Sequence, residues 1–223
     1  MGKKEFAVLG LGRFGSSVAT TLTRLGYPTL GADRDEAVVN ELSSFLPRIV
    51  QADTTREDVL SSMNLKDCAA VIIGIGSFQE SVITAVRVKR LGVNHILAKA
   101  YDEVHSQVLK EIGVDRIVCP EKEMGARVAL GLVSPSIVDY IELSPELGVL
   151  DVTIGEGFAG KSLRQLRLPE RFGVNVIAVK RGKRIEITLP PDESLQVGDI
   201  LALIGERQGI NRLSVELEGK LGA

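Results

Sequence analysis

The chain has 223 residues, of which 44% are hydrophobic and 25% are charged, a composition that suits one or two folded domains and excludes a disordered or collagen-like chain. Lys and Arg number 27 against 29 Asp and Glu, so no overall basic field is present to attract nucleic acid or anionic lipid. No apolar stretch approaches the roughly 20 residues that cross a bilayer, and no secretory core opens the sequence, so we expect a soluble, intracellular protein.

Six short apolar runs, each followed by a break, predict the strands of one parallel sheet. They lie at Phe6–Leu9, Thr29–Ala32, Arg48–Gln51, Ala70–Ile75, His95–Lys99 and Arg116–Cys119. Between successive runs, apolar residues recur at three- and four-residue steps, as in Phe14, Val18 and Leu22, which is typical of a helix with one buried face. The alternation predicts an α/β fold with a Rossmann-like, doubly wound parallel sheet over residues 1–121.

The pattern changes after Pro120. A helical stretch over Lys122–Val133 and a short amphipathic segment through Tyr140 and Leu143 predict crossover helices, so residues 122–143 are interpreted as a connector. Further elements are expected as strands at Val149–Ile154, Val174–Val179, Arg184–Thr188 and Ile200–Ile204, and as helices at Ser162–Leu166 and Arg207–Leu217. Residues 144–223 therefore predict a small α+β lobe.

The sequence Gly10-Leu11-Gly12-Arg13-Phe14-Gly15 lies where the first strand ends and the first helix begins. In a dinucleotide-binding fingerprint the first glycine permits a tight turn, the second lets the backbone approach a phosphate, and the third lets the helix pack on the strand. Asp33 ends the second strand, where a carboxylate accepts hydrogen bonds from an adenosine ribose. Together these signals predict nucleotide binding, whereas the glycines alone would also suit a plain strand-to-helix turn.

Polar residues follow the other strands at the edge where a doubly wound sheet binds its ligand. We expect Asp53 and Thr54 after the third strand, and Ile75, Gly76 and Ser77 after the fourth, to face the nucleotide. Helix N-caps are the alternative roles of Asp53 and Ser77.

Two cationic residues stand at the same edge. Arg13 lies at the mouth of the glycine loop, where a guanidinium can make bidentate contacts to a terminal phosphate. Lys99 closes the fifth strand and can reach a phosphate as well. For both residues a solvated surface position is the alternative.

Catalysis finds little support in the residue types. His95 and His105 are the two histidines, and neither stands at a spacing that suggests a catalytic triad, so both are interpreted as structural or solvated. Cys68 and Cys119 lie in no metal-ligand spacing and are interpreted as buried hydrophobic residues. We therefore expect a binding protein rather than an enzyme, with a small NAD-dependent oxidoreductase as the alternative.

Five features of the sequence, taken in order, resemble a known family. They are Phe6–Gly15 with its GLGRFG form, Asp33, Gln51–Thr55, Gly113–Gly125 with its PEKEMG form, and Gly173–Val179. Over essentially its whole length the chain is similar to the regulatory RCK (KTN, or TrkA-N plus TrkA-C) subunits of bacterial potassium uptake systems, most closely the KtrA/KtrC type.

The resemblance implies a nucleotide site for ATP or ADP. Its residues would be Gly10, Gly12, Arg13, Phe14, Gly15, Asp33, Asp53, Thr54, Ile75, Gly76, Ser77, Lys99 and Glu121. In this set the resemblance implies that Arg13 contacts the γ-phosphate and Asp33 holds the ribose. It also implies that Glu121 reaches the site of a neighbouring subunit, where paired carboxylates hold a metal cation beside the nucleotide. An acidic residue favoured by the dipole of the helix that follows is the alternative role of Glu121.

The resemblance further implies homodimers that close into an eight-subunit ring beneath a membrane potassium channel subunit of the KtrB/TrkH type. The chain would then be cytoplasmic and peripheral on the inner face of the cell membrane through that partner, with no nucleic-acid partner. C-lobes of the family bind cyclic di-AMP at a two-fold interface. In this sequence such contacts fall near Arg167, Asn175, Ile177 and Pro190.

An apolar stripe after residue 122 also predicts contact with another subunit, with intramolecular packing as its alternative. It consists of Met124, Val128, Ala129 and Leu132. The expected function is that of a cytosolic ATP/ADP-sensing regulatory subunit that gates a membrane potassium channel. Because related subunits prefer NAD(H), and the glycine loop with Asp33 suits any adenosine nucleotide, NAD(H) sensing stays the alternative; Arg13 favours a triphosphate.

Overall fold

The computed structural model describes residues 4–133, 136–144, 146–187 and 190–219. The chain divides into two units, Met1–Lys122 and Glu123–Ala223, and each is described by itself. Within the described ranges, no helix has the length and apolar character needed to cross a lipid bilayer.

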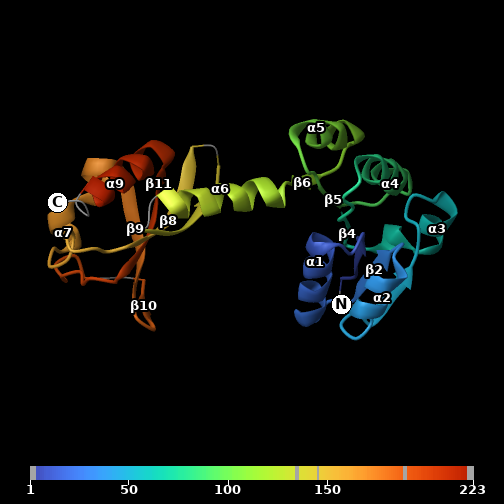
Figure 1. Ribbon diagram of the computed structural model, residues 1–223, viewed down its shortest axis with the longest axis horizontal. Coiled ribbons are helices and arrows are strands. Elements are labelled where there is room, and N and C mark those ends of the chain that lie inside the picture. Colours follow the sequence, from blue (N-terminus) through green and yellow to red (C-terminus); the bar gives the residue numbers. More distant parts are fainter. Residues whose placement is uncertain (1–3, 134–135, 145, 188–189, 220–223) are drawn as a thin grey trace. The chain divides into compact units, whose positions relative to one another are not determined.

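The first unit is built on a parallel sheet with the strand order β3-β2-β1-β4-β5-β6. Figure 1 labels β2, β4, β5 and β6 of this sheet. The strands are β1 Phe6–Leu9, β2 Thr29–Asp33, β3 Arg48–Gln51, β4 Ala70–Ile73, β5 Ile96–Lys99 and β6 Arg116–Val118. Each neighbouring pair runs parallel. The predicted six-stranded, doubly wound sheet is confirmed.

Helices cover both faces of this sheet, as a buried parallel sheet requires. They are α1 Arg13–Arg24, α2 Glu36–Leu42, α3 Glu57–Ser62, α4 Phe78–Arg90 and α5 Glu103–Ile112, with a 3-10 turn at Leu65–Asp67. α1 and α2 pack on the face that carries Val8 and Ile72. α4 and α5 pack on the opposite face, which carries Ala7 and Val71, because successive strand residues point to opposite sides.

The strand order places a topological switch point at the centre of the first sheet. β1 lies between β2 and β4, and the helices that follow β1 and β4 leave toward opposite faces. In open α/β sheets the ligand crevice lies at the carboxyl ends of the strands at such a point. The loops that follow β1 and β4 therefore define the place where a ligand is expected.

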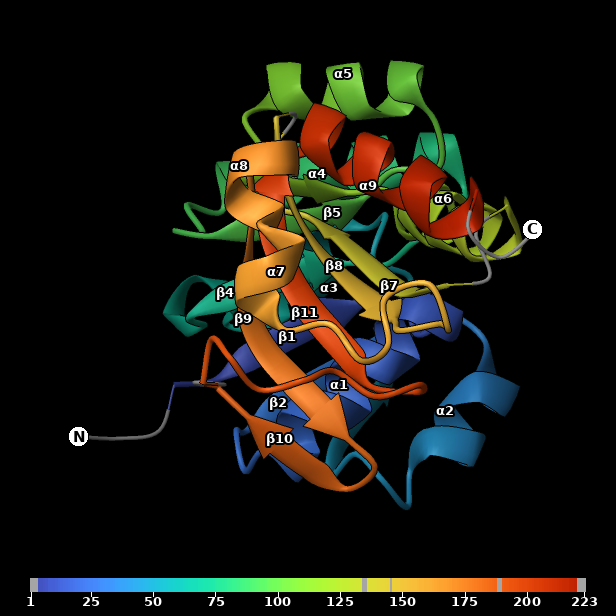
Figure 2. The same cartoon turned by 90° about the vertical axis from the view of Figure 1, so that its left-hand side faces the viewer.

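The second unit contains an antiparallel sheet with the strand order β10-β9-β11-β8-β7. Its strands are β7 Ile137–Glu142, β8 Leu147–Thr153, β9 Val174–Arg181, β10 Arg184–Glu186 and β11 Ile200–Glu206. Its helices are α7 Leu163–Leu166, α8 Leu168–Phe172 and α9 Arg207–Gly219, while α6 Pro120–Val133 begins in the first unit and continues into the second. α7, α8 and α9 pack on one face of the sheet through a shared apolar cluster, so the predicted α+β lobe is confirmed (Figure 2).

One part of the expected connector is wrong. The pattern through Tyr140 and Leu143 predicts a second crossover helix, but Ile137–Glu142 forms β7, which pairs antiparallel with β8. The branched side chains of Ile137, Val138 and Ile141 favour a strand, and pairing with β8 satisfies the backbone of this segment. The expected strand Arg184–Thr188 ends at Glu186 as β10, and Thr188 lies outside the described residues.

Candidate functional site

The loop between β1 and α1 is held in shape by two of its glycines. Gly10 has a φ of +87°, and a Cβ there would lie 2.8 Å from Cγ1 of Ile75. A Cβ on Gly15 would lie 1.9 Å from the carbonyl oxygen of Gly10. Only glycine fits at these two positions, so the loop brings the start of α1 against the end of β1.

Packing does not require glycine at position 12, because a Cβ on Gly12 would meet no heavy atom within 4 Å. It is the N-cap of α1 and, having no side chain, leaves the first backbone N–H groups of the helix without a side-chain cap. By contrast, Asp35, Ser77 and Asp102 cap α2, α4 and α5 with side-chain oxygens. The open N-terminus of α1 carries the positive end of the helix dipole and suits an anion such as a phosphate.

Asp33 ties the end of β2 to the glycine loop. Its Oδ2 accepts a hydrogen bond from the N–H of Leu11 at 2.6 Å, and its Oδ1 accepts one from the N–H of Asp35 at 2.9 Å. A carboxylate has about four acceptor positions, so these two bonds leave capacity for a ribose hydroxyl.

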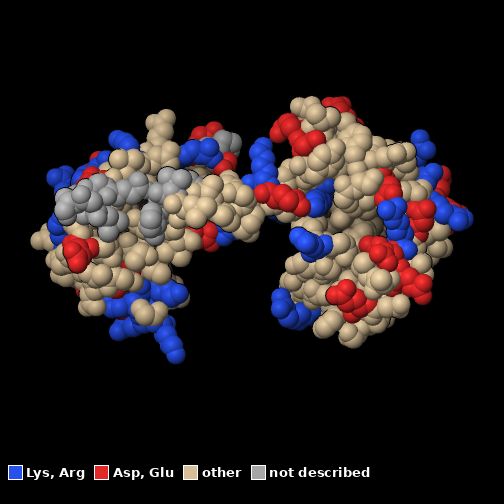
Figure 3. All heavy atoms as spheres, viewed as in Figure 1, with Lys and Arg blue, Asp and Glu red and all other residues tan. Residues whose placement is uncertain are grey.

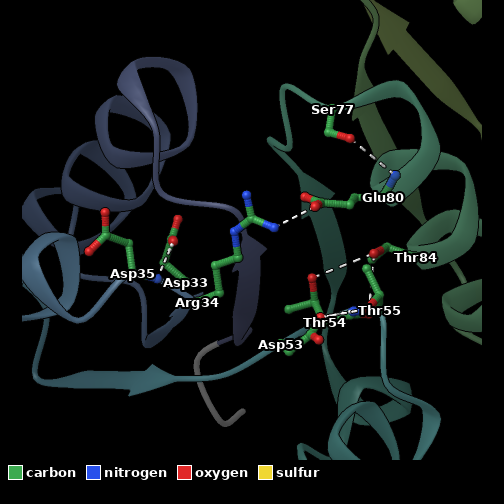
Figure 4. Close-up of polar contacts among 9 residues, drawn as sticks. All are labelled: Asp33, Arg34, Asp35, Asp53, Thr54, Thr55, Ser77, Glu80 and Thr84. Carbon is green, nitrogen blue, oxygen red and sulfur yellow. Dashed lines mark hydrogen bonds and ion pairs between the residues drawn. The ribbon is translucent and has the colours of Figure 1, made fainter.

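A cleft of about 390 Å³ opens at this edge of the sheet, within the size range of small-ligand sites. It is lined by Gly10, Gly12, Asp33, Arg34, Asp35, Val38, Ala52, Asp53, Thr54, Thr55, Gly74, Ile75, Gly76, Ser77 and Glu80. Eight of the predicted nucleotide-binding residues are in this set. Figure 4 shows side chains from the β2, β3 and β4 ends of the cleft.

Asp53 and Thr54 follow β3 at one side of the cleft (Figure 4). Oδ1 of Asp53 accepts hydrogen bonds from the hydroxyl of Thr55 at 2.6 Å and from its N–H at 2.9 Å, and these bonds lower the pKa of the Asp53 carboxyl. Thr54 is buried, and its carbonyl oxygen accepts a hydrogen bond from the hydroxyl of Thr84 at 3.2 Å. The N-cap of α3 is Arg56, so Asp53 is not a helix cap, whereas Ser77 both caps α4 and lines the cleft.

The other predicted nucleotide residues do not line this cleft. Arg13 is the first residue of α1 and is exposed, while Phe14 packs against the apolar cluster under α1. Lys99, at the end of β5, donates to Oε1 of Glu121 at 2.5 Å, and this bond lowers the pKa of the Glu121 carboxyl. The two residues are therefore brought together as an ion pair, with Glu121 in the first turn of α6.

Two cleft residues, Arg34 and Glu80, were absent from the predicted set. They form an ion pair across the cleft, in which Nη1 of Arg34 donates to Oε1 of Glu80 (Figure 4). Signals for both exist in the sequence. Arg34 directly follows Asp33, and Glu80 stands three residues after Ser77, as in a capping box.

The described residues of one chain do not form a metal site around Glu121. Among the described residues, no three His, Cys, Asp or Glu side chains lie close enough together to hold a metal ion. His95 is exposed, whereas His105 is buried with its Nε2 at 3.2 Å from Oγ of Ser81.

Comparison with known families matches both units. Residues 6–120 match the TrkA-N domain, and residues 149–217 match the TrkA-C domain. The chain belongs to the TrkA-N/TrkA-C family of RCK proteins. It is 39% identical over 211 residues to the Ktr system potassium uptake protein C of Bacillus subtilis, a match that covers 94% of this chain and 96% of the relative. Ktr system potassium uptake protein A of Vibrio alginolyticus is 35% identical, with 92% and 93% covered.

Solved structures agree on the fold. The GsuK RCK domain superposes with a TM-score of 0.69 at 17% identity, covering 97% of this chain and 48% of that longer chain. The GsuK channel bound to NAD gives a TM-score of 0.68 at 18% identity, covering 93% of this chain and 38% of the channel. The solved structures thus show that the chain has the fold of an RCK domain.

In the RCK C-lobe, the residues expected to contact a cyclic dinucleotide lie in short exposed segments. Arg167 joins α7 to α8 in the left-handed conformation, with a φ of +48°, and is exposed. Asn175 and Ile177 lie on the exposed side of β9, with Ile177 at the bulge in the β9–β11 pairing. Pro190 is also exposed.

A basic hairpin follows these β9 residues. Lys180, Lys183 and Arg184 are exposed around the turn from β9 to β10, and Figure 3 shows Lys and Arg side chains gathered over this end of the second unit. Exposed guanidinium and ammonium groups beside an apolar strand suit a ligand with both phosphates and aromatic bases.

Proposed function

We propose that this RCK subunit senses ATP against ADP and thereby gates a membrane potassium channel or transporter subunit. The observation that carries the proposal is the open N-terminus of α1, which faces the cleft beside Gly12 and Asp33. A phosphate at this helix end and a ribose at Asp33 are the two contacts that an adenosine nucleotide requires at a switch point.

In this proposal, the cleft divides into two ends. Asp33, Asp53 and Thr54, together with Ile75, Gly76 and Ser77, hold the adenosine, while Gly10 and Gly12 hold the phosphates and Arg13 reaches the last of them from the start of α1, outside the cleft lining. Arg13 is the residue that separates the two nucleotides, because its exposed guanidinium can pair with a γ-phosphate that ADP lacks.

Lys99 and Glu121 supply the second sensing element of the proposal. In the chain alone they neutralise each other as an ion pair, although Glu121 is 65% exposed. A triphosphate draws Lys99 toward the phosphates and frees the carboxylate of Glu121, which with a carboxylate of a neighbouring subunit holds a cation beside the nucleotide. Carboxylate oxygens are the ligands that Mg²⁺ and Ca²⁺ prefer.

Gating follows if ATP and ADP have different free energies of interaction with two forms of an assembly. We propose homodimers that close into an eight-subunit ring on a membrane subunit of the KtrB/TrkH type, which places the chain at the inner face of the cell membrane. The Bacillus and Vibrio relatives, which bear the name of Ktr potassium uptake proteins, support this choice of partner.

The test is calorimetric titration of the full chain with ATP, ADP and NADH. We expect ATP to bind more tightly than ADP, and Arg13→Gln to weaken ATP binding by about tenfold to hundredfold, the effect of one lost charge-assisted hydrogen bond. Arg24→Gln, at the other end of α1, is the matched control and leaves the ATP affinity unchanged. Tighter binding of NADH than of ATP, with no difference between ATP and ADP, would instead support NAD(H) sensing.

For the C-lobe we propose cyclic di-AMP as a second ligand, held at a two-fold interface by Arg167, Asn175, Ile177 and Pro190. The exposed face of β9 offers an apolar side chain to a purine ring, and Arg167 offers a guanidinium to a phosphate. Titration of the full chain should show binding that Arg167→Gln weakens and that Arg212→Gln, an exposed change on α9, does not. Absence of any heat would leave the C-lobe as a dimerisation module.

A further inference from the structure

The ion pair between Arg34 and Glu80 crosses the centre of the candidate nucleotide cleft. Arg34 follows β2 and Glu80 lies in the first turn of α4 after β4, and these two strands flank β1 on its two sides. The pair therefore links the two halves of the sheet across the switch point. In Figure 4 the guanidinium extends from the β2 side toward the carboxylate of Glu80.

Arg34 forms a direct ion pair with Glu80 and also acts, through its charge, on the carboxylate of Asp53. Of the described residues that line the cleft, Arg34 alone has a cationic side chain. Its backbone is fixed, because its carbonyl oxygen accepts a hydrogen bond from Nε2 of Gln51 at 3.2 Å. Its side chain is 67% exposed, so the guanidinium is held by Glu80 rather than by packing.

The carboxylates of the cleft differ in what holds them. Asp33 accepts two backbone N–H groups, Asp35 accepts the N–H of Ala37, and Asp53 accepts the N–H and hydroxyl of Thr55. Glu80, whose side chain is 29% exposed, is in direct contact with the guanidinium of Arg34, whereas Arg34 and Arg56 act on Asp53 only through their charge. Glu80 and Arg34 thus form a direct side-chain ion pair in the cleft.

The chemistry of ribose recognition indicates a role for the Arg34–Glu80 ion pair. In dinucleotide sites a carboxylate after the second strand accepts the ribose 2′-hydroxyl, whereas an arginine nearby accommodates a 2′-phosphate. This chain carries both residue types side by side, as Asp33 and Arg34. We propose that Glu80 sets the ribose specificity of the cleft, by holding Arg34 away from the ribose so that a nucleotide with a free 2′-hydroxyl is accepted and one with a 2′-phosphate is rejected.

The inference rests on the proposed function, because it requires adenosine in this cleft with its ribose at Asp33. A 2′-phosphate entering there would face two carboxylates, those of Asp33 and Glu80. It would gain the guanidinium of Arg34 only by taking it from Glu80, which would leave Glu80 as an unbalanced charge beside the phosphate. Exposed ion pairs are weak individually, so the discrimination that Glu80 provides should amount to about tenfold.

The test compares two small probes that differ only in the group under discussion, adenosine 5′-monophosphate and adenosine 2′,5′-bisphosphate. The measured quantity is the ratio of their affinities for the full chain. We expect the wild type to favour the monophosphate and Glu80→Gln to shift the ratio about tenfold toward the bisphosphate. The shift should be smaller at 0.5 M salt, because screening weakens charge interactions.

Two further variants separate the proposed roles. Adding Arg34→Gln to Glu80→Gln should abolish the shift of the affinity ratio toward the bisphosphate, because the guanidinium of Arg34 is the group that Glu80→Gln releases. Glu41→Gln removes the same charge from the exposed side of α2, outside the cleft, and should leave the ratio at its wild-type value.

The outcomes distinguish the two levels of inference. If neither probe binds the folded wild-type chain, the proposed nucleotide site itself fails. If the monophosphate binds and Glu80→Gln leaves the ratio unchanged, or if the double variant keeps the gain, the role assigned to Glu80 and Arg34 is wrong while the nucleotide site stands.

Discussion

Gly12 and Gly15 belong to one loop but are required for different reasons. A Cβ on Gly15 would clash with the backbone of Gly10, whereas a Cβ on Gly12 would enter open space, and Gly12 has a φ of −60° that any residue adopts. We predict that Gly12→Ala melts within about 2 °C of the wild type but loses at least about tenfold in ATP affinity, because the methyl group takes the place of a phosphate. Gly15→Ala should lose more than about 3 kcal/mol of folding stability. Thermal melting and calorimetric titration check both, and full ATP affinity in folded Gly12→Ala would contradict the site.

Asp199 is a buried carboxylate in the second unit. Its side chain is 2% exposed and accepts hydrogen bonds from Nη2 of Arg181 at 2.8 Å and from the N–H of Gln196 at 2.8 Å, with Arg181 the main cause of its lowered pKa. A carboxyl with a lowered pKa stabilises the fold above its unfolded pKa, near 4, and this stabilisation is lost as the pH falls through the folded pKa. We predict that Arg181→Gln lowers the melting temperature at pH 7 by about 6 to 15 °C, and that this difference becomes smaller as the pH falls below about 4, where the stabilisation from the lowered pKa of Asp199 is progressively lost.

The matched control for this pair is Arg164→Gln. Arg164 pairs with Asp192, but both side chains are about two-thirds exposed, at 67% and 72%, so the change should lower the melting temperature by less than about 2 °C. Circular dichroism measures the melting temperatures of both variants at pH 7. Equal decreases for Arg181→Gln and Arg164→Gln would show that the burial of Asp199 does not determine how much its ion pair stabilises the fold.

At the scale of elements, α6 stands out because its apolar side chains face solvent. Met124, Val128 and Leu132 are 52%, 55% and 78% exposed, and their four-residue spacing puts them on one face. Stripes of this kind mark interaction surfaces. We predict that Val128→Glu with Leu132→Glu gives monomers in analytical ultracentrifugation, while Ala126→Glu, on the opposite face of the same helix, keeps the assembly. An unchanged assembly in the double variant would assign the contact to another surface.

The sequence predicts features that depend on local patterns better than features that depend on contacts between distant positions. Gly10 and Asp33 were predictable because each stands at a strand end in a recognisable sequence pattern, and the strand order then brings the ends together. The Arg34–Glu80 pair was not, since it joins side chains 46 positions apart and no periodicity encodes such a contact. The strand β7 was missed because Ile137–Glu142 is too short for its pattern to separate helix from strand without its partner β8.

At the scale of the whole molecule, the proposed function requires that the presence of one phosphate group changes the structure that the subunit presents to a membrane partner. The candidate nucleotide cleft lies in the first unit, and α6, which begins at Pro120 next to Glu121, continues into the second unit. A ligand that engages Glu121 would therefore act at the start of a helix that continues from the first unit into the second. In the proposed assembly, ATP and ADP can favour different forms only through interactions that one nucleotide makes and the other lacks.

The most direct measurement of the central claim is potassium flux through proteoliposomes that contain a KtrB-type membrane subunit and the full chain. The flux with ATP should differ from the flux with ADP at saturating concentrations of each. Arg13→Gln should remove this difference, while Arg24→Gln should preserve it. Identical flux with ATP and ADP in the wild type, under conditions where both nucleotides are bound, would contradict the claim that this subunit reads the γ-phosphate.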